Sequence, residues 1–202
     1  KRKPRPPPMT VDEFHRIPAP RVLKTHSPRQ VFLGASIEDG SLLPGTKVVY
    51  VTRDPKDACV SSYYHAFNPH RSGWPFDAWV KLWVTGLFEH GTWWDHVKAW
   101  EQEAVDHPDQ VLIVTYEDLL RQPHEQVRRI ADFLGLVGAT DDVIRATVRN
   151  SRFDAMKKAS QGDRFADFYR KGETGDWTEH FDPTGPLLSE FDSIHSREMA
   201  RK

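Results

Sequence analysis

A lysine and a histidine, Lys24 and His26, end a short apolar stretch of the chain with one residue between them. If residues 21–25 form a β-strand, alternation along the strand places both side chains on the same side. Such a pair supplies a positive charge together with a base, because a neutral imidazole accepts a proton near neutral pH. The simpler interpretation is a surface histidine, since the chain contains ten histidines.

A candidate anion site follows the apolar run "KVVYVT", which ends at Arg53. A helix is expected over residues 54–67, and Ser61 lies two turns into it. A guanidinium beside the free N–H groups of a helix N-terminus suits the oxygens of a phosphate. In the alternative interpretation, Arg53 pairs with Asp54 or Asp57 and only stabilises the fold.

A second basic element is the stretch "RKGETGDW", in which Arg170 and Lys171 stand directly before Gly172. Two side-chain cations and the backbone N–H groups of a glycine-containing loop can together surround a phosphate. On its own, such a stretch is also compatible with an ordinary turn.

The stretch "NSRFDAMKK" places Phe153 and Met156 three residues apart, with Ser151 just before them. An apolar pair at this spacing can flank a flat ring. The alternative is a helix that packs its apolar face against the core.

Regular elements must position these residues, and the sequence predicts both strands and helices. The expected buried strands are residues 21–25, 47–52 and 111–116, and the expected helices are residues 54–67, 76–88, 92–104 and the stretch from Pro123 to Gly135. Strands that alternate with helices predict an α/β fold with a mostly parallel sheet. The tryptophans of the second and third helices are expected to be core residues, namely Trp79, Trp83, Trp93 and Trp100.

The composition is that of a globular chain of 202 residues, long enough for one domain with a core. Lysine and arginine (28) nearly balance aspartate and glutamate (29), so charge indicates neither a nucleic-acid nor a membrane partner. A single cysteine excludes an intrachain disulfide and a cysteine-based zinc site, and it fits a cytoplasmic location. We expect a basic, proline-rich tail at residues 1–17 and one domain at residues 18–202.

Taken in order, "KTH", the Arg53–Ser61 unit, "TYEDL", "SRF" with its following methionine, and "RKGETGDW" resemble the cytosolic sulfotransferase family. The resemblance covers about residues 18–180. Members of this family transfer a sulfonate from 3′-phosphoadenosine 5′-phosphosulfate (PAPS) to a hydroxyl or an amine. The resemblance implies a P-loop-NTPase-like fold of three layers with a mostly parallel central sheet.

The resemblance also implies a role for each motif residue. His26 takes the place of the general base, and Lys24 takes that of the lysine that assists around the sulfonate. Tyr116 matches the tyrosine near the adenine. Binding of the 3′-phosphate is implied for Arg53, Ser61, Arg170, Lys171 and Gly172. The positions around the adenine ring are Ser151, Phe153 and Met156. PAPS is the implied cosubstrate, a small molecule is the implied acceptor, and no metal is implied.

Two features of the family pattern have no counterpart in the printed sequence. A loop like "YPKSGTTW", which cradles the 5′-phosphosulfate, is absent, so we expect an N-terminally truncated domain without the first strand and its loop. The activity of the printed chain therefore stays open. The family's dimer motif "KxxxTVxxxE" is not recognisable either, because Thr178, Asp182 and Pro183 stand at its positions, which leaves a monomer or another dimer mode.

Three other functions compete with an active cytosolic sulfotransferase. A sulfotransferase-like pseudoenzyme that only binds nucleotide or a partner is compatible with the missing loop, although Lys24, His26, Arg53 and Ser61 are intact. A nucleotide kinase would need a Walker A sequence, which the chain does not contain. A Golgi carbohydrate sulfotransferase fits the basic start but not the single cysteine. The identity of the acceptor cannot be derived from the sequence.

Overall fold

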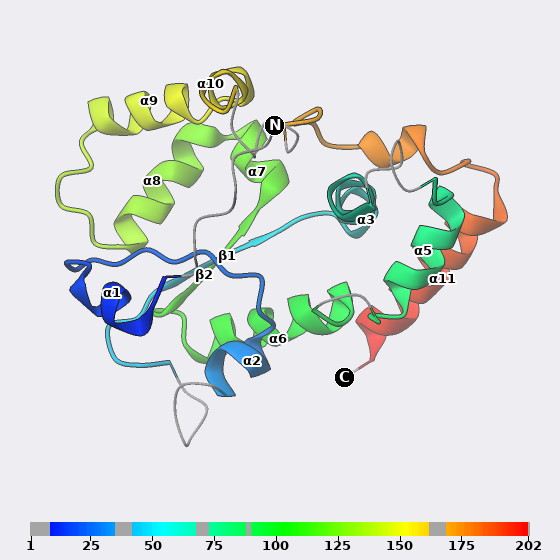
Figure 1. Ribbon diagram of the computed structural model, residues 1–202, viewed down its shortest axis with the longest axis horizontal. Coiled ribbons are helices and arrows are strands. Elements are labelled where there is room, and N and C mark those ends of the chain that lie inside the picture. The colour runs from blue at the N-terminus through cyan, green and yellow to red at the C-terminus, as the bar shows by residue number, and fades with distance from the viewer. Residues whose placement is uncertain (1–8, 35–41, 68–72, 88–89, 162–168, 202) are drawn as a thin grey trace.

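The computed structural model describes residues 9–34, 42–67, 73–87, 90–161 and 169–201 (Figure 1). Its elements, in chain order, are α1 (Val11–Arg16), α2 (Arg29–Gly34), β1 (Val48–Thr52), α3 (Pro55–Ser62), the π-helical turn η1 (Tyr63–Phe67), α5 (Phe76–Val84), α6 (Trp93–Asp106), β2 (Val111–Thr115), α7 (Tyr116–Arg121), α8 (Pro123–Phe133), α9 (Asp141–Asn150), α10 (Phe153–Ala159), the 3₁₀ turn η3 (Asp176–Glu179) and α11 (Pro186–Ala200).

The two strands pair in parallel, with Val48 opposite Val111 and Thr52 opposite Thr115. This confirms two of the three predicted strands and the predicted parallel sheet. Because the register is even, both strands end at the same edge, where Arg53 and Tyr116 follow directly. Residues that follow parallel strands at one edge are placed close together, and the candidate anion site lies at this edge.

The third predicted strand is wrong: residues 21–28 have no regular secondary structure. Val22 is 92% exposed and Leu23 is 68% exposed, so the apolar pair is not buried in a sheet. A strand needs a neighbour for its backbone N–H and C=O groups, and in the described part of the chain β1 and β2 pair only with each other. Strand alternation therefore does not set the directions of Lys24 and His26.

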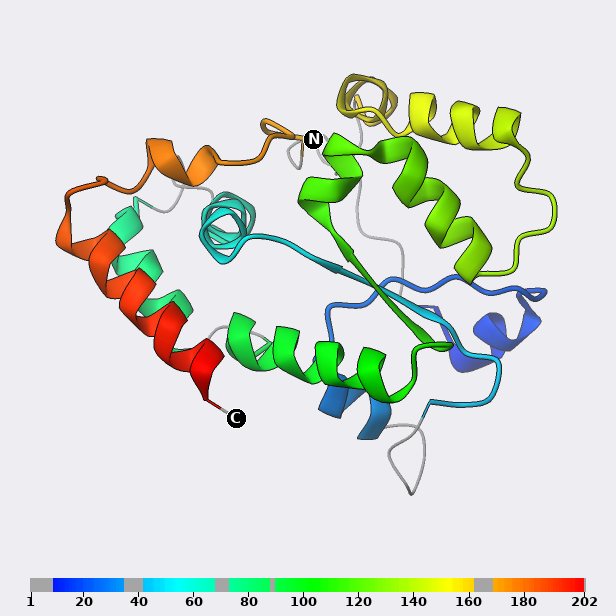
Figure 2. The same cartoon turned by 180° about the vertical axis from the view of Figure 1, so that it is seen from behind.

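Helices cover both faces of the strand pair, as a three-layer α/β fold requires. Trp100 of α6 packs in one cluster with Val48 and Val111, on the face that also carries Tyr50. Helix α8 contacts β2 as well, and Figure 2 shows α6 and α8 on opposite sides of the strands. The predicted helices at residues 54–67, 92–104 and 123–135 are thus confirmed, the first of them with a π-helical end.

A second cluster joins α3, α5, α6 and α11 around aromatic side chains (Figure 1). Trp79 is fully buried in this cluster, and Trp83 and Trp93 pack against it as partly buried residues. Trp100, in the cluster beside the strands, is 2% exposed. The prediction that these tryptophans are packing residues is confirmed. Trp94, which the pattern did not single out, is also fully buried and donates from Nε1 to His195 Nδ1 at 2.9 Å.

Helix α1 falls within the predicted tail at residues 1–17, of which residues 1–8 lie outside the described part. Thr10 caps this helix, and its hydroxyl and backbone both bond with Glu13. The boundary between tail and domain stays a prediction. Within the described residues, we find no helix that is long and apolar enough to span a bilayer.

Candidate functional site

The cation at the end of β1, Arg53, is held by three neighbours. Its Nη2 donates to the carbonyl oxygen of Glu173 at 2.7 Å and lies 3.5 Å from Oδ2 of Asp57. Its guanidinium carbon lies 4.4 Å from the centroid of the Tyr116 ring, a cation–π contact. The strand end, the helix that follows and the stretch after Lys171 therefore meet at this arginine.

Helix α3 begins here because its first turn is well capped. Asp54 accepts hydrogen bonds from the backbone N–H groups of Lys56 and Asp57, and Pro55 occupies the first helical position. The backbone N–H of Asp54 in turn donates to Glu117 Oε1 of α7 at 3.0 Å. The acidic start predicted from the sequence is thus a true N-cap, and it ties α3 to the end of β2.

Asp57 is the residue that holds the basic loop in place, and the sequence analysis considered it only as a partner for Arg53. It is 1% exposed, and its two oxygens accept from the backbone N–H groups of Gly175 (2.7 Å) and Trp177 (3.0 Å). The sequence contained a signal for this role: Asp57 stands four residues after Arg53, and residues at this spacing lie on the same side of a helix.

The two loop cations are organised by another buried carboxylate, Asp176. Arg170 bonds to Asp176 Oδ2, and Lys171 Nζ lies 2.5 Å from Asp176 Oδ1 and also bonds to Glu179. Burial alone would raise the pKa of Asp176, but hydrogen bonds from both cations hold it below its usual value. The hydrogen bonds that Lys171 donates to Asp176 and Glu179 raise the pKa of Lys171, so its ammonium group is charged at neutral pH.

Arg170 also lies over an aromatic ring, with its guanidinium carbon 4.3 Å from the centroid of Tyr64. Tyr64 belongs to η1, and the sequence analysis did not select it. Because η1 follows α3 directly, Tyr64 lies next to Arg170 of the basic loop. The Arg170 guanidinium is thus oriented by two contacts, its ion pair with Asp176 and its stacking on the Tyr64 ring.

Gly172 and Phe153 meet at a very close contact. The glycine has φ +73°, and a Cβ on it would lie 2.1 Å from Cδ2 of the Phe153 ring. Only glycine fits here, both because of its conformation and because of the ring. The Phe153 ring also contacts that of Tyr169 at 6.0 Å between centroids. Two stretches that the sequence analysis selected separately are thus in direct contact.

Four other predicted residues remain, and within the described part of the chain only Tyr116 of these has a contact with the group, through its ring and Arg53. Ser61 is exposed on α3, one turn beyond Asp57. Ser151 is exposed at the end of α9, and Met156 is 38% exposed on α10. Tyr116 is half-buried, and burial raises the pKa of its hydroxyl although Arg53 opposes the shift. These roles stay predictions.

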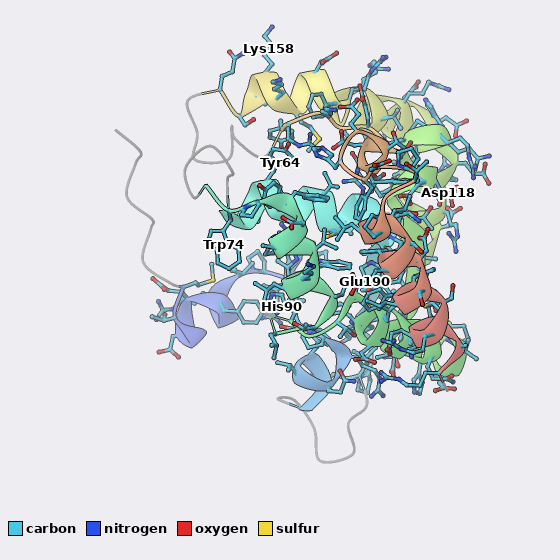
Figure 3. All side chains as sticks on the ribbon, turned by 90° about the vertical axis from the view of Figure 1, so that its right-hand side faces the viewer. Tyr64, Trp74, His90, Asp118, Lys158 and Glu190 are labelled. Carbon is cyan, nitrogen blue, oxygen red and sulfur yellow. The ribbon has the colours of Figure 1, made fainter. Side chains whose placement is uncertain are left out.

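The predicted base, His26, contacts residues at and before the start of α6. The rings of His26 and His90 stack at 6.0 Å between centroids, and the carbonyl oxygen of His26 lies 3.3 Å from His96 Nε2. Lys24 and His26 are both exposed. In the view of Figure 3, labelled His90 appears nearer to the blue helix α2, and labelled Tyr64 appears nearer to the yellow helix α10.

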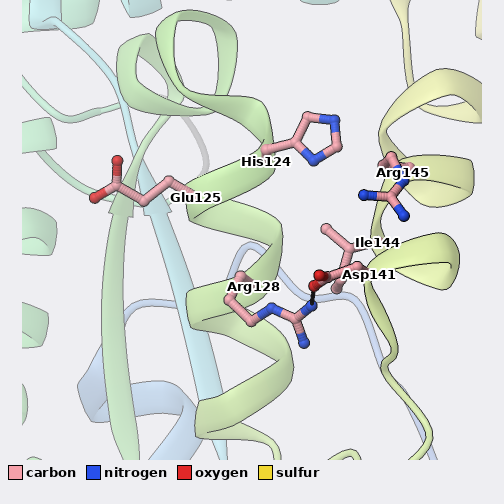
Figure 4. A pocket seen from close by; sticks show the side chains of 6 residues that line it. All are labelled: His124, Glu125, Arg128, Asp141, Ile144 and Arg145. Atoms are coloured by element: carbon pink, nitrogen blue, oxygen red, sulfur yellow. Dashed lines mark hydrogen bonds and ion pairs between the residues drawn. The ribbon is translucent and has the colours of Figure 1, made fainter.

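A hollow of about 500 Å³ is lined by Ser27, the residue after His26, and by His90 and His96, which both contact His26. Its lining is mixed, with apolar Val31 and Pro28 opposite the polar side chains of Thr92 and His96. A smaller hollow of about 340 Å³ lies between α8 and α9, where Arg128 pairs with Asp141 (Figure 4). It contains none of the predicted site residues.

The group around Arg53 suits the phosphate of a nucleotide in two respects. Among the residues that the structure describes, the buried Nε of Arg53 has no hydrogen-bond partner, so an acceptor is missing where an anion would supply one. The close approach of Gly172 to Phe153 leaves a bare backbone beside an aromatic face. In the described part of the chain, no cluster of three or more potential metal ligands occurs.

Comparison with known proteins identifies the family to which the chain belongs. The profile of the family described as "Sulfotransferase domain" matches residues 4–202. The chain belongs to the sulfotransferase family. This confirms the resemblance found in the motifs, and it accounts for the order in which they occur along the chain.

Individual sulfotransferases agree with this assignment. The chain is 32% identical to human sulfotransferase 1C2 in an alignment 212 residues long, which covers 96% of this chain and 67% of that protein. It is 36% identical to sulfotransferase 6B1 of Danio rerio over 208 residues, 96% of this chain and 64% of that protein. The chain thus spans about two thirds of the length of these relatives.

Solved sulfotransferase structures share the fold. Mouse sulfotransferase SULT7A1, determined in complex with PAP, superposes with a TM-score of 0.78 at 27% identity, covering 95% of this chain and 69% of that one. Retinol dehydratase, determined with androsterone and PAP, superposes with a TM-score of 0.76 at 23% identity. The predicted α/β sulfotransferase fold is confirmed.

Proposed function

We propose that this protein transfers a sulfonate group from PAPS to a hydroxyl or amine of a small-molecule acceptor. The observation that carries the proposal is the convergence of Arg53, Arg170, Lys171 and Gly172 at the sheet edge where both parallel strands end. These residues come from distant motifs, and family membership supports reading them as one nucleotide site. The PAP in the mouse SULT7A1 structure supports PAPS as donor.

The 3′-phosphate of the nucleotide is the group proposed to bind there. Arg53 offers a buried Nε–H that has no partner within the described part of the chain, and Arg170 and Lys171 stand nearby in the basic loop, each paired with Asp176. A phosphate carries enough negative charge to compete with the carbonyl oxygen of Glu173 for Arg53 Nη2, because hydrogen bonds between charged groups are about twice as strong as neutral ones. Phe153 supplies a ring face, and Ser61 and Tyr116 lie on the neighbouring helix and strand end.

The chemical step needs a base for the acceptor, and His26 is proposed for this role. The acceptor oxygen forms a bond to sulfur while the bond between sulfur and the bridging oxygen of the donor breaks. The acceptor proton goes to the neutral imidazole of His26, and the electron pair of the broken bond goes to the departing phosphate. Lys24 is proposed to stabilise the negative charge that develops during transfer.

The acceptor is proposed to enter the hollow beside His26. Its mixed lining, with Val31 and Pro28 next to Thr92 and His96, suits a molecule with an apolar body and one hydroxyl. The retinol dehydratase structure with androsterone shows that a protein of this fold takes such a molecule. A phenol is therefore a suitable first probe.

The test is the His26→Ala variant of the natural gene product, assayed with PAPS and 4-nitrophenol. We expect sulfonate transfer to disappear while the affinity for adenosine 3′,5′-bisphosphate (PAP), measured by calorimetry, stays within about twofold. His124→Ala, at an exposed histidine on α8, is the matched control and should retain full activity. A His26→Ala variant with most of its activity would show that the base is another residue.

A further inference from the structure

One face of α6 holds the segment that carries His26. His96, Trp100 and Glu103 lie at positions i, i+4 and i+7, which share one side of a helix. His96 contacts the backbone of His26, Trp100 packs on Phe32 at 5.7 Å between ring centroids, and Glu103 pairs with Arg29. The segment from His26 into α2 is therefore attached to α6 at three successive turns.

The contact at the first of these turns fixes the tautomer of His96. Its Nε2 lies 3.3 Å from the carbonyl oxygen of His26, and its Nδ1 lies 2.9 Å from the hydroxyl of Tyr50. A carbonyl can only accept, so Nε2 carries the hydrogen. In a neutral ring Nδ1 is then the acceptor, and the Tyr50 hydroxyl donates to it.

The environment of the pair agrees with this assignment. Burial lowers the pKa of His96, the backbone contact with His26 opposing the shift, and burial also raises the pKa of Tyr50. A neutral imidazole and a protonated phenol are the forms that the two hydrogen bonds require. Tyr50 also stacks on the rings of His96 and Trp100, with centroids 5.6 and 5.7 Å away.

Two neighbours of His26 thus come from the start of α6. His96 bonds to its carbonyl oxygen, and His90, two residues before the N-cap Thr92, stacks on its ring. Because residues 21–28 form no strand, no sheet ladder holds this backbone. The contacts with His96 and His90 hold the His26 segment in place, as the hydrogen bonds of a sheet would hold a strand.

We propose that His96 is a positioning residue for sulfonate transfer: its Nε2–H holds the His26 backbone, while the Tyr50 hydroxyl keeps His96 in that tautomer. This rests on the proposed role of His26 as the base. A base displaced by about 1 Å can lose two orders of magnitude in rate. The chain Tyr50–His96–His26 therefore connects strand β1, which also delivers Arg53, to the acceptor side of the site.

The first test compares three variants of the natural gene product with PAPS and 4-nitrophenol. We expect His96→Phe to lower kcat by about 10- to 100-fold while the Kd for PAP is unchanged. His96→Gln should recover activity to within about threefold of the wild type, because its amide N–H reaches the place of Nε2–H. Tyr50→Phe keeps the ring stacking and should lower kcat by about 3- to 10-fold, the effect of one lost hydrogen bond.

A second readout is independent of turnover. Imidazole nitrogen NMR of the wild type should show His96 as the neutral tautomer protonated at Nε2, and Tyr50→Phe should replace this signal by a mixture of tautomers. His124→Phe on α8 is the matched control for a lost histidine ring and should leave kcat and the His96 signal unchanged.

The outcomes separate this inference from the proposed function. Wild-type kcat in both His96→Phe and Tyr50→Phe, or equal losses in His96→Gln and His96→Phe at unchanged melting temperature, would overturn the positioning role. A wild-type protein that neither binds PAP nor transfers sulfonate would instead overturn the proposed function. A parallel loss of kcat and PAP affinity in His96→Phe would mean that the residue only stabilises the fold.

Discussion

Asp57 and Gly175 lie 118 residues apart in the sequence, and the Asp57 carboxylate accepts a hydrogen bond from the Gly175 backbone at 2.7 Å. The same carboxylate accepts from Trp177 and faces Arg53. Helix α3 and the basic loop are therefore joined through one buried side chain. The cations of the proposed phosphate site owe their mutual placement to this carboxylate.

Replacement of Asp57 by asparagine should loosen the basic loop. The amide keeps one acceptor but loses the charge, so a backbone N–H is left unsatisfied and Arg53 loses its partner. We expect the free energy of unfolding to fall by about 1–3 kcal/mol, measured by urea denaturation, together with weaker PAP binding. Asp132→Asn, at an exposed aspartate on α8, should change neither quantity. Unchanged stability of Asp57→Asn would contradict the structural role of this carboxylate.

Replacement of Arg53 by alanine should act on the nucleotide and not on the chemical step. A lost charged hydrogen bond weakens PAP binding by about 1.5–3 kcal/mol, which titration calorimetry measures directly. The matched control is Arg145→Ala, because Arg145 is exposed on α9 and pairs only with nearby Asp142 in the recorded ion pairs. Equal affinities of the wild type and Arg53→Ala would place the phosphate elsewhere.

Replacement of Gly172 by alanine tests the contact with Phe153. The backbone at φ +73° costs about 1–3 kcal/mol for a residue with a side chain, and the new methyl group would collide with the ring. Gly45 also has a positive φ but open space around it, so Gly45→Ala measures the backbone cost alone. In the double variant, Phe153→Ala should remove the part of the Gly172→Ala destabilisation that comes from the collision. If the losses in the free energy of unfolding, measured by urea denaturation, were additive, the collision would be excluded.

Acid should weaken the basic loop through Asp176. Its pKa is held below the usual value in the folded protein, so the unfolded state binds the proton more readily. The stabilisation is complete above the unfolded pKa of about 3.9 and is lost as the pH falls through the lower, folded value. Urea denaturation between pH 3 and pH 7 should therefore show a shallower acid decline for Asp176→Asn. An identical slope in both proteins would argue against this linkage.

The strands show how much secondary structure the local sequence pattern predicts. Residues 47–52 and 111–116 are each rich in β-branched residues, and both stretches form strands. Residues 21–25 offer only Val22 and Leu23 before the polar Lys24, and they remain without a partner in the described part of the chain. A segment forms a strand only where another strand lies beside it, and the sequence of the segment alone does not show whether one does.

The sequence by itself determined helix α3, the two parallel strands and the family, because caps, β-branched stretches and motif order depend on residues that are close in the chain. The N-cap Asp54 before Pro55 is one such local feature. Only the tertiary structure decided that Asp57 holds the basic loop and that Phe153 lies against Gly172. It alone also brought His96 to His26. These contacts join residues far apart in the chain, and packing of the whole domain, not local preference, brings such residues together.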